Sequence, residues 1–196
     1  MSGGGLTGGL QMAAIVQERL LPAEEFFSMP DGENQYELVQ GTLVCMAAAG
    51  GLHGKIASRV DQRLRNFVEA HGRGEVCTAE TGFRLAHNPD TVRAPDVAFV
   101  ARERISTEGV PEGFWPFAPD LAVEVILPSD RFDDVMSKVQ EYLNAGTRLV
   151  WVLHPRTQTA MAYRPTGEAR LLRGQDELSG EEVLPGFRCR VDELFA

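Results

Sequence analysis

Glu124 is the single charged residue in LAVEVIL, the run from Leu121 to Leu127 whose other residues are apolar. The run is short, rich in valine and isoleucine, and bounded by PD and PSD, a pattern that predicts a strand buried on both faces. Burying an isolated carboxylate is costly, so such a group is normally neutralised, paired or bound to a metal. We therefore expect Glu124 to have a partner, either a metal ion or a neighbouring arginine.

Asp96 is a second acidic residue in an apolar setting, because it follows Pro95 and precedes the strand-like run VAFV. Proline cannot donate a hydrogen bond to a sheet, so Pro95 indicates a strand start or an edge, where a side chain can be reached from solvent. Taken alone, Asp96 is more typical of a turn-forming residue at a strand end.

Lys138 interrupts the apolar stripe of a predicted helix. On a period of about 3.6 residues, Val135, Val139 and Tyr142 form the inward face, and Lys138 lies in the middle of it. A lysine at such a position can extend its ammonium back to solvent while its aliphatic stem packs. The alternative is a contact with Glu124, because the predicted strand of Glu124 leads directly into this helix.

Glu37 and His53 complete the set of candidate polar residues. Glu37 lies in YELVQG on a predicted hairpin, where a glutamate usually faces solvent, and His53 opens a long helix, where a histidine is often a cap. Each residue alone favours the structural interpretation. Their occurrence together with the two acidic strand residues and Lys138 favours a site.

The elements that must position these residues can be predicted from hydrophobic spacing and turn residues. We expect a short helix in LPAEEFFSMPDG, a hairpin turning at Gln40-Gly41, and a helix from His53 to His71. A third helix should follow Asp130, with an aspartate N-cap and a closing Gly146. The predicted strands are EVCTAETGFRL, VRAPDVAFV, LAVEVIL, RLVWVLH and TAMAYRP, followed by a short strand-like tail to Phe195. This order predicts an α/β domain with a central mixed β-sheet flanked by helices and an N-terminal β-hairpin.

Length and composition suit one domain with a sizeable core, because the chain has 196 residues, 43% of them hydrophobic and 24% charged. We expect residues 1–11 to be a flexible glycine-rich N-terminus and residues 12–196 to form the domain. The net charge of -9 and the pI near 5.0 argue against a broad basic surface that coats nucleic acid without specificity. The net charge does not exclude a local basic groove.

The three cysteines, Cys45, Cys77 and Cys189, are odd in number and form no C-x-x-C pair, so neither a disulfide framework nor a zinc knuckle is indicated. The first residues have no basic region with an apolar stretch of signal-peptide length, and no run of 18 apolar residues occurs. We expect a protein of the reducing cytoplasm that does not associate with membranes.

Pro95-Asp96 at one strand, Glu124 in the next and a nearby lysine together resemble the PD-(D/E)XK nuclease superfamily. The second motif departs from the pattern, because Ile126 stands where the lysine is usual; Lys138, on the following helix, could supply the same ammonium. More closely, five segments in order resemble the Uma-type family of putative restriction endonucleases within that superfamily: YELVQGTLV, HGKI, RAPDVAFV, PDLAVEVILPSD and KVQEYLNAGTRLVWVLHP. The similarity covers roughly Pro22 to Pro165. Leu127, where a serine is common, is a minor departure.

The resemblance implies a restriction-endonuclease-like fold and a Mg²⁺-dependent endonuclease acting on DNA, with Mn²⁺ as a substitute ion. The family's site positions fall on Glu37, Asp96, Glu124 and Lys138, with His53 beside them. Asp96 and Glu124 would hold the metal, Lys138 would orient or deprotonate the attacking water, Glu37 would assist with the metal, and His53 would contact a phosphate.

The alternative is a catalytically silent domain of the same fold that binds nucleic acid or another protein. A phosphate-binding P-loop at AAAGGLHGKI is disfavoured, because Ala49 and Ile56 replace two residues that the motif requires. We also expect a homodimer, because nucleases that cut both strands commonly pair two sites about a two-fold axis. The apolar loop GFWPF, Gly113 to Phe117, is the candidate surface patch for that contact.

Overall fold

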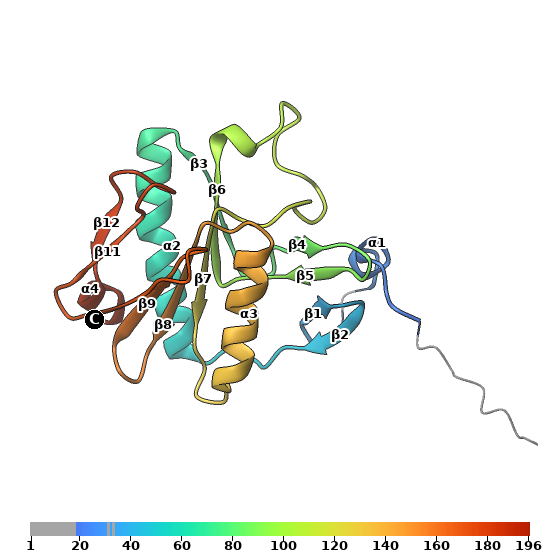
Figure 1. Ribbon diagram of the computed structural model, residues 1–196, viewed down its shortest axis with the longest axis horizontal. Coiled ribbons are helices and arrows are strands. Elements are labelled where there is room, and N and C mark those ends of the chain that lie inside the picture. Colours follow the sequence, from blue (N-terminus) through green and yellow to red (C-terminus); the bar gives the residue numbers. More distant parts are fainter. Residues whose placement is uncertain (1–18, 31, 33) are drawn as a thin grey trace, which may run out of the picture.

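The fold is that of a computed structural model, which describes residues 19–30, 32 and 34–196 (Figure 1). The expected flexible segment 1–11, and the start of the expected domain at residue 12, lie outside the described residues. Four α-helices and one short 3₁₀-helix are described: α1 (Ala23–Phe27), α2 (Gly51–His71), η1 (Arg102–Arg104), α3 (Phe132–Asn144) and α4 (Val191–Phe195).

A six-stranded mixed sheet forms the centre of the molecule, in the order β10-β9-β8-β7-β6-β3. Its strands are β3 (Gly74–Thr78), β6 (Val97–Ala101), β7 (Leu121–Val125), β8 (Leu149–His154), β9 (Thr159–Tyr163) and β10 (Ala169–Arg173). β7 and β8 are parallel, and the other neighbouring strands are antiparallel. The predicted strand LAVEVIL is therefore confirmed as a central strand, with β6 on one side and β8 on the other.

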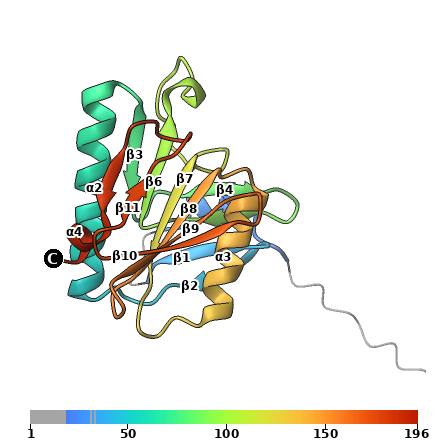
Figure 2. The ribbon, with the colours of Figure 1, turned by 60° about the vertical axis from the view of Figure 1, so that its left-hand side comes forward.

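The two long helices cover opposite faces of this sheet, as Figures 1 and 2 show. The stripe Ile56, Val60, Leu64 and Val68 of α2 is buried in the larger core, against alternate side chains of β6, β7 and β8. α3 packs its buried Val139 and Tyr142 on the other face. Alternation along β7 sends Val123 and Val125 toward α2, and Glu124 toward α3.

A second, four-stranded antiparallel sheet, in the order β2-β1-β5-β4, lies beside α3. Its strands are β1 (Tyr36–Val39), β2 (Thr42–Cys45), β4 (Phe83–Ala86) and β5 (Thr91–Arg93). The predicted hairpin is confirmed: Gln40 and Gly41 turn with φ of 49° and 76°, the paired positive values that suit a two-residue connection between twisted strands. This hairpin carries Glu37.

Two of the predicted strands are wrong as single elements. EVCTAETGFRL divides into β3 and β4, and VRAPDVAFV divides into β5 and β6, so each run contributes to both sheets. The physical reason lies at the breaks, where Glu80 takes a positive φ and Pro95 cannot continue a ladder. The chain crosses between the sheets at Asp96.

Three smaller predictions also need correction. Asp130 is not the N-cap of α3: Arg131 holds that position without a side-chain cap, and the Asp130 carboxylate accepts a hydrogen bond from the Leu127 N–H at 2.8 Å. The C-terminal tail forms a two-stranded sheet of β11 (Glu177–Ser179) and β12 (Arg188–Arg190) and ends in α4. The loop GFWPF is not an exposed patch, because Trp115 is 2% exposed and Phe114 packs against Phe26.

Within the described part of the chain, no helix is both long and apolar enough to cross a membrane.

Candidate active site

Glu124 lies on β7 with its carboxylate between the sheet and α3, 13% exposed. The Tyr142 hydroxyl donates to its Oε1 at 2.8 Å, and the Lys138 Nζ lies 3.6 Å from its Oε2. Burial raises the pKa of Glu124 and outweighs the ammonium of Lys138, which lowers it; with Asp96 and Glu37 adding repulsion, the pKa reaches about 7. Among the described residues, Glu124 thus contacts a lysine and a tyrosine, and not the arginine that was the alternative to a metal ion.

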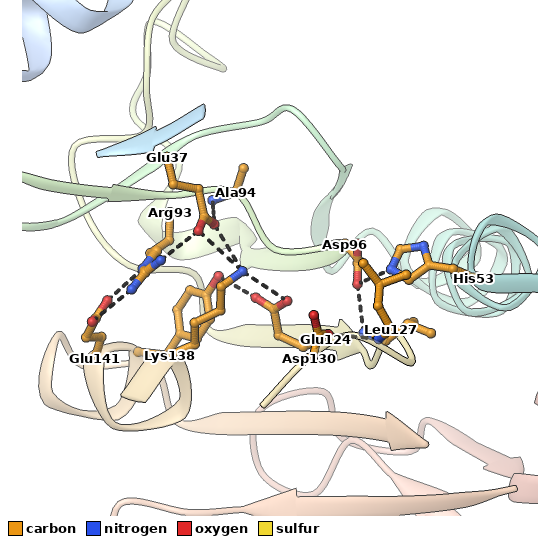
Figure 3. A network of polar contacts seen from close by, with 12 residues as sticks. Glu37, His53, Arg93, Ala94, Asp96, Glu124, Leu127, Asp130, Lys138 and Glu141 are labelled. Atoms are coloured by element: carbon orange, nitrogen blue, oxygen red, sulfur yellow. Dashed lines mark hydrogen bonds and ion pairs between the residues drawn. The ribbon is translucent and has the colours of Figure 1, made fainter. Parts of the chain in front are cut away.

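Lys138 projects inward from α3, as the stripe of the helix predicts, and its side chain is 18% exposed. Its ammonium lies between two carboxylates, 3.3 Å from the Glu37 oxygens and 3.6 Å from Glu124 (Figure 3). Burial lowers the pKa of Lys138, but attraction to Glu124 and Glu37 more than compensates, so the net shift is upward. Lys138 therefore carries its proton at neutral pH and does not extend to solvent.

Glu37 is 1% exposed, which corrects the expectation of a solvent-facing hairpin glutamate. Besides Lys138, its carboxylate accepts hydrogen bonds from the Arg93 Nη1 at 2.7 Å and from the Ala94 N–H at 3.1 Å. Arg93 in turn forms a bidentate pair with Glu141 of α3, at 2.7 and 2.9 Å. Glu37 of β1 thus contacts both β5, in the same four-stranded sheet, and α3.

Asp96 lies immediately before β6, as Pro95 predicts, and its side chain is 15% exposed. Its Oδ2 accepts two hydrogen bonds, from the Val125 N–H at 2.7 Å and from the Nε2 of His53 at 3.1 Å. The hydrogen bond with Asp96 raises the pKa of His53, although burial opposes the change. Because Val125 follows Glu124, the backbone bond fixes Asp96 next to the second candidate carboxylate.

The structure therefore brings all five candidate residues into one region, Glu37, Lys138 and Glu124 on one side and Asp96 and His53 beside them (Figure 3). It also adds three residues that the sequence did not indicate: Arg93, Glu141 and Tyr142. Arg93 is a polar residue in a three-residue strand and Glu141 lies next to an apolar stripe, so neither departs from an ordinary pattern. Tyr142 was predicted as a core residue, and its hydroxyl partner depends on the tertiary fold.

Comparison with known proteins gives one family and a solved structure of the same fold. The sequence pattern of the Uma2 family, described as "Putative restriction endonuclease", matches residues 23–192. The chain belongs to this family. Membership supports a nuclease-like function, and it confirms the resemblance seen in the sequence.

The solved structure is the crystal structure of a putative nuclease of the DUF820 group from Anabaena variabilis ATCC 29413. It superposes with a TM-score of 0.78 at 20% identity, covering 89% of this chain and 97% of that one. At this identity the likeness shows the fold, and it confirms the restriction-endonuclease-like class. No curated protein matches the chain.

Proposed function

We propose that this Uma2 family member is a Mg²⁺-dependent endonuclease that hydrolyses phosphodiester bonds in DNA. The observation that supports it best is the convergence of two carboxylates, Asp96 and Glu124, with the ammonium of Lys138 beside the end of β7. Hydrolysis of a phosphodiester requires that negative charge developing on the phosphate be stabilised and that a water be aligned for attack. The family description points to DNA as the substrate.

The donor set suits a hard cation. Among the residues that the structure describes, no three or more acidic, histidine or cysteine side chains form a ready-made metal cage. Mg²⁺ does not need one, because it is usually held by one or two carboxylates, with water and substrate oxygens completing its shell. Both hydrogen bonds that Asp96 accepts from the described residues use Oδ2, which leaves Oδ1 for a cation. Burial makes the negative charge of Glu124 unfavourable, and a cation would compensate for it. Asp96 and Glu124 are therefore the proposed ligands. When bound, the ion would neutralise phosphate charge and lower the pKa of a water.

The remaining residues act around these two carboxylates. Lys138 is already protonated between Glu37 and Glu124, so we assign it orientation of the attacking water and stabilisation of phosphate charge, in preference to proton abstraction. Glu37 is engaged by Arg93, the Ala94 N–H and Lys138, which favours a role in holding Lys138 over one in holding the metal. His53, whose raised pKa favours the imidazolium, is the proposed phosphate contact.

Replacement of Lys138 tests this assignment. Lys138→Met keeps the inward stripe filled, so the fold should be preserved, while cleavage of supercoiled plasmid with Mn²⁺ should slow by roughly 10²- to 10⁴-fold. Glu124→Gln is the inactive reference. A Lys138→Met protein that cleaves at the wild-type rate would show that the lysine is structural. A wild-type protein that binds DNA and metal without cleaving would favour the catalytically silent alternative.

We also propose a homodimer in the cytoplasm. The support for the dimer is that nucleases cutting both strands commonly pair two active sites. The loop GFWPF gives no further support, because it is packed into the fold. The free thiols of Cys45, Cys77 and Cys189 suit a reducing compartment. Light scattering of the wild-type protein at high concentration should give twice the chain mass of 21.5 kDa; a strict monomer would remove the dimer.

A further inference from the structure

Lys138 reaches the candidate site from a helix, whereas Asp96 and Glu124 are fixed by the register of neighbouring strands. A lysine ammonium at the end of a four-carbon stem has many accessible positions, and nothing in helix geometry selects the one above Glu124. The selection must come from groups around the ammonium. Glu37 supplies it, because the Lys138 Nζ lies 3.3 Å from the Glu37 carboxylate oxygens.

Glu37 itself is held by Arg93. The Arg93 side chain is 8% exposed, and its guanidinium donates to Glu37 with Nη1 and to Glu141 with Nε and Nη2. The planar guanidinium fixes both carboxylates in direction as well as in distance. Since Glu37 lies on β1, Arg93 on β5 and Glu141 on α3, this group of three residues, the Arg93 clamp, joins the second sheet to the helix that carries Lys138 (Figure 3).

The charges show what the clamp does for Lys138. Three carboxylates, Glu37, Glu124 and Glu141, surround two cations, Arg93 and Lys138. Arg93 engages Glu141 with the Nε and Nη2 edge of its guanidinium and Glu37 with Nη1, which leaves Lys138 to bridge Glu37 and Glu124. Without the guanidinium, Lys138 would be the single cation among three carboxylates, and its position above Glu124 would no longer be selected.

We propose that Arg93 is a positioning residue for the candidate active site: through Glu37 and Glu141 it fixes the place of the Lys138 ammonium over Glu124. The proposal concerns the site whose nuclease function is proposed above and rests on that function only for its catalytic consequence. The placement of the ammonium itself is a property of the folded chain and can be measured without substrate or metal.

Two lysines are present in the whole sequence, Lys55 and Lys138, and Lys55 is exposed at the surface of α2. Side-chain ¹⁵N spectra of lysine-labelled, metal-free protein should therefore show one protected ammonium, assigned to Lys138 by its loss in Lys138→Met. Arg93→Gln should shift this signal and abolish its protection from solvent exchange. Glu141→Gln should weaken that protection. The matched control is Arg84→Gln: Arg84, on β4 of the same sheet as Arg93, also pairs with two carboxylates, Glu24 of α1 and Asp90, but does not contact Lys138.

Catalysis gives the second readout. Arg93→Gln should lower kcat for plasmid cleavage with Mn²⁺ by about 10²-fold, the usual effect of a misplaced catalytic group, with KM for DNA changed less than about threefold. In the Lys138→Met background, Arg93→Gln should lower kcat almost no further, because the ammonium that Arg93 positions is absent. A clamp with a purely structural role would cost the same factor in both backgrounds. Glu141→Gln, in which Arg93 keeps Glu37, is the milder variant should Arg93→Gln fail to fold.

The two readouts distinguish a failure of the positioning role of Arg93 from a failure of the proposed nuclease function. A protected Lys138 signal that Arg93→Gln abolishes, in a wild-type protein without nuclease activity, would uphold the clamp and remove the proposed function. A Lys138 signal that survives both Arg93→Gln and Glu141→Gln, or equal rate losses with and without Lys138, would overturn the proposal.

Discussion

At the scale of single residues, Glu124 links the electrostatics of the site to the stability of the protein. Its pKa of about 7 exceeds the ordinary 4.5 because burial and the neighbouring Asp96 and Glu37 outweigh Lys138 and the Tyr142 hydroxyl. A carboxyl whose folded-state pKa is raised binds its proton more tightly in the folded state. The contribution of Glu124 to the free energy of unfolding should therefore be largest below about pH 4.5. It should be lost as the pH rises through 7, by up to about 3 kcal/mol.

We expect metal-free wild-type protein to lose stability between pH 5 and 8.5, and Glu124→Gln to lose much less. His53, whose pKa is also raised, contributes a decline of the same sign, so the measurement is the difference between the two proteins at each pH. Urea unfolding across this range measures it, with the exposed Glu182→Gln as control. A parallel decline in wild type and Glu124→Gln would show that Glu124 titrates as an ordinary surface carboxyl.

At the scale of elements, the sequence predicts what is local and misses what depends on partners. The hairpin and the two long helices follow from Gly41, Gly72 and apolar spacing, and all three are confirmed. The division of two predicted strands between two sheets could not be predicted, because strand pairing is set by contacts distant in sequence. The same holds for Arg93: its partners lie 56 and 48 residues away, so a short strand pattern carries no sign of its role.

The turn of the β1–β2 hairpin gives a prediction at this scale. Gly41 has a φ of 76°, and a Cβ there would lie 2.6 Å from the Leu20 Cβ, so Gly41→Ala combines backbone strain with a clash. We expect a loss of roughly 1–3 kcal/mol in unfolding free energy. Gly167→Ala, at a φ of 84° with open space around it, isolates the backbone contribution and should cost less. Equal losses in calorimetry would show that Leu20 moves aside freely.

At the scale of the whole molecule, the fold places several carboxylates at the site where we propose that a negatively charged substrate binds. The chain carries a net charge of -9, and within the site Glu37 and Glu141 are balanced by Arg93 and Lys138. Asp96 is in contact with one histidine, and Glu124 shares Lys138 with Glu37. The sequence could predict Glu124 and Asp96 as acids in apolar settings, but the net charge around them depends on which cations the fold places nearby.

A cation that binds this site in the folded state should stabilise the whole protein by mass action. At a metal concentration about one hundred times the dissociation constant, the gain is about 2.7 kcal/mol, which raises the Tm of a chain of this size by roughly 5–10 °C. We expect this shift with Mg²⁺ or Mn²⁺ in wild type and its loss in Asp96→Asn, which removes one proposed ligand. Because an acidic protein is also stabilised by general screening, calorimetry must be run at constant ionic strength, with Asp133→Asn, an exposed aspartate on α3, as control. If Asp96→Asn shifts as much as wild type and Asp133→Asn do, the ion binds away from β7, and the charge of Glu124 would be compensated by Lys138 and Tyr142 alone.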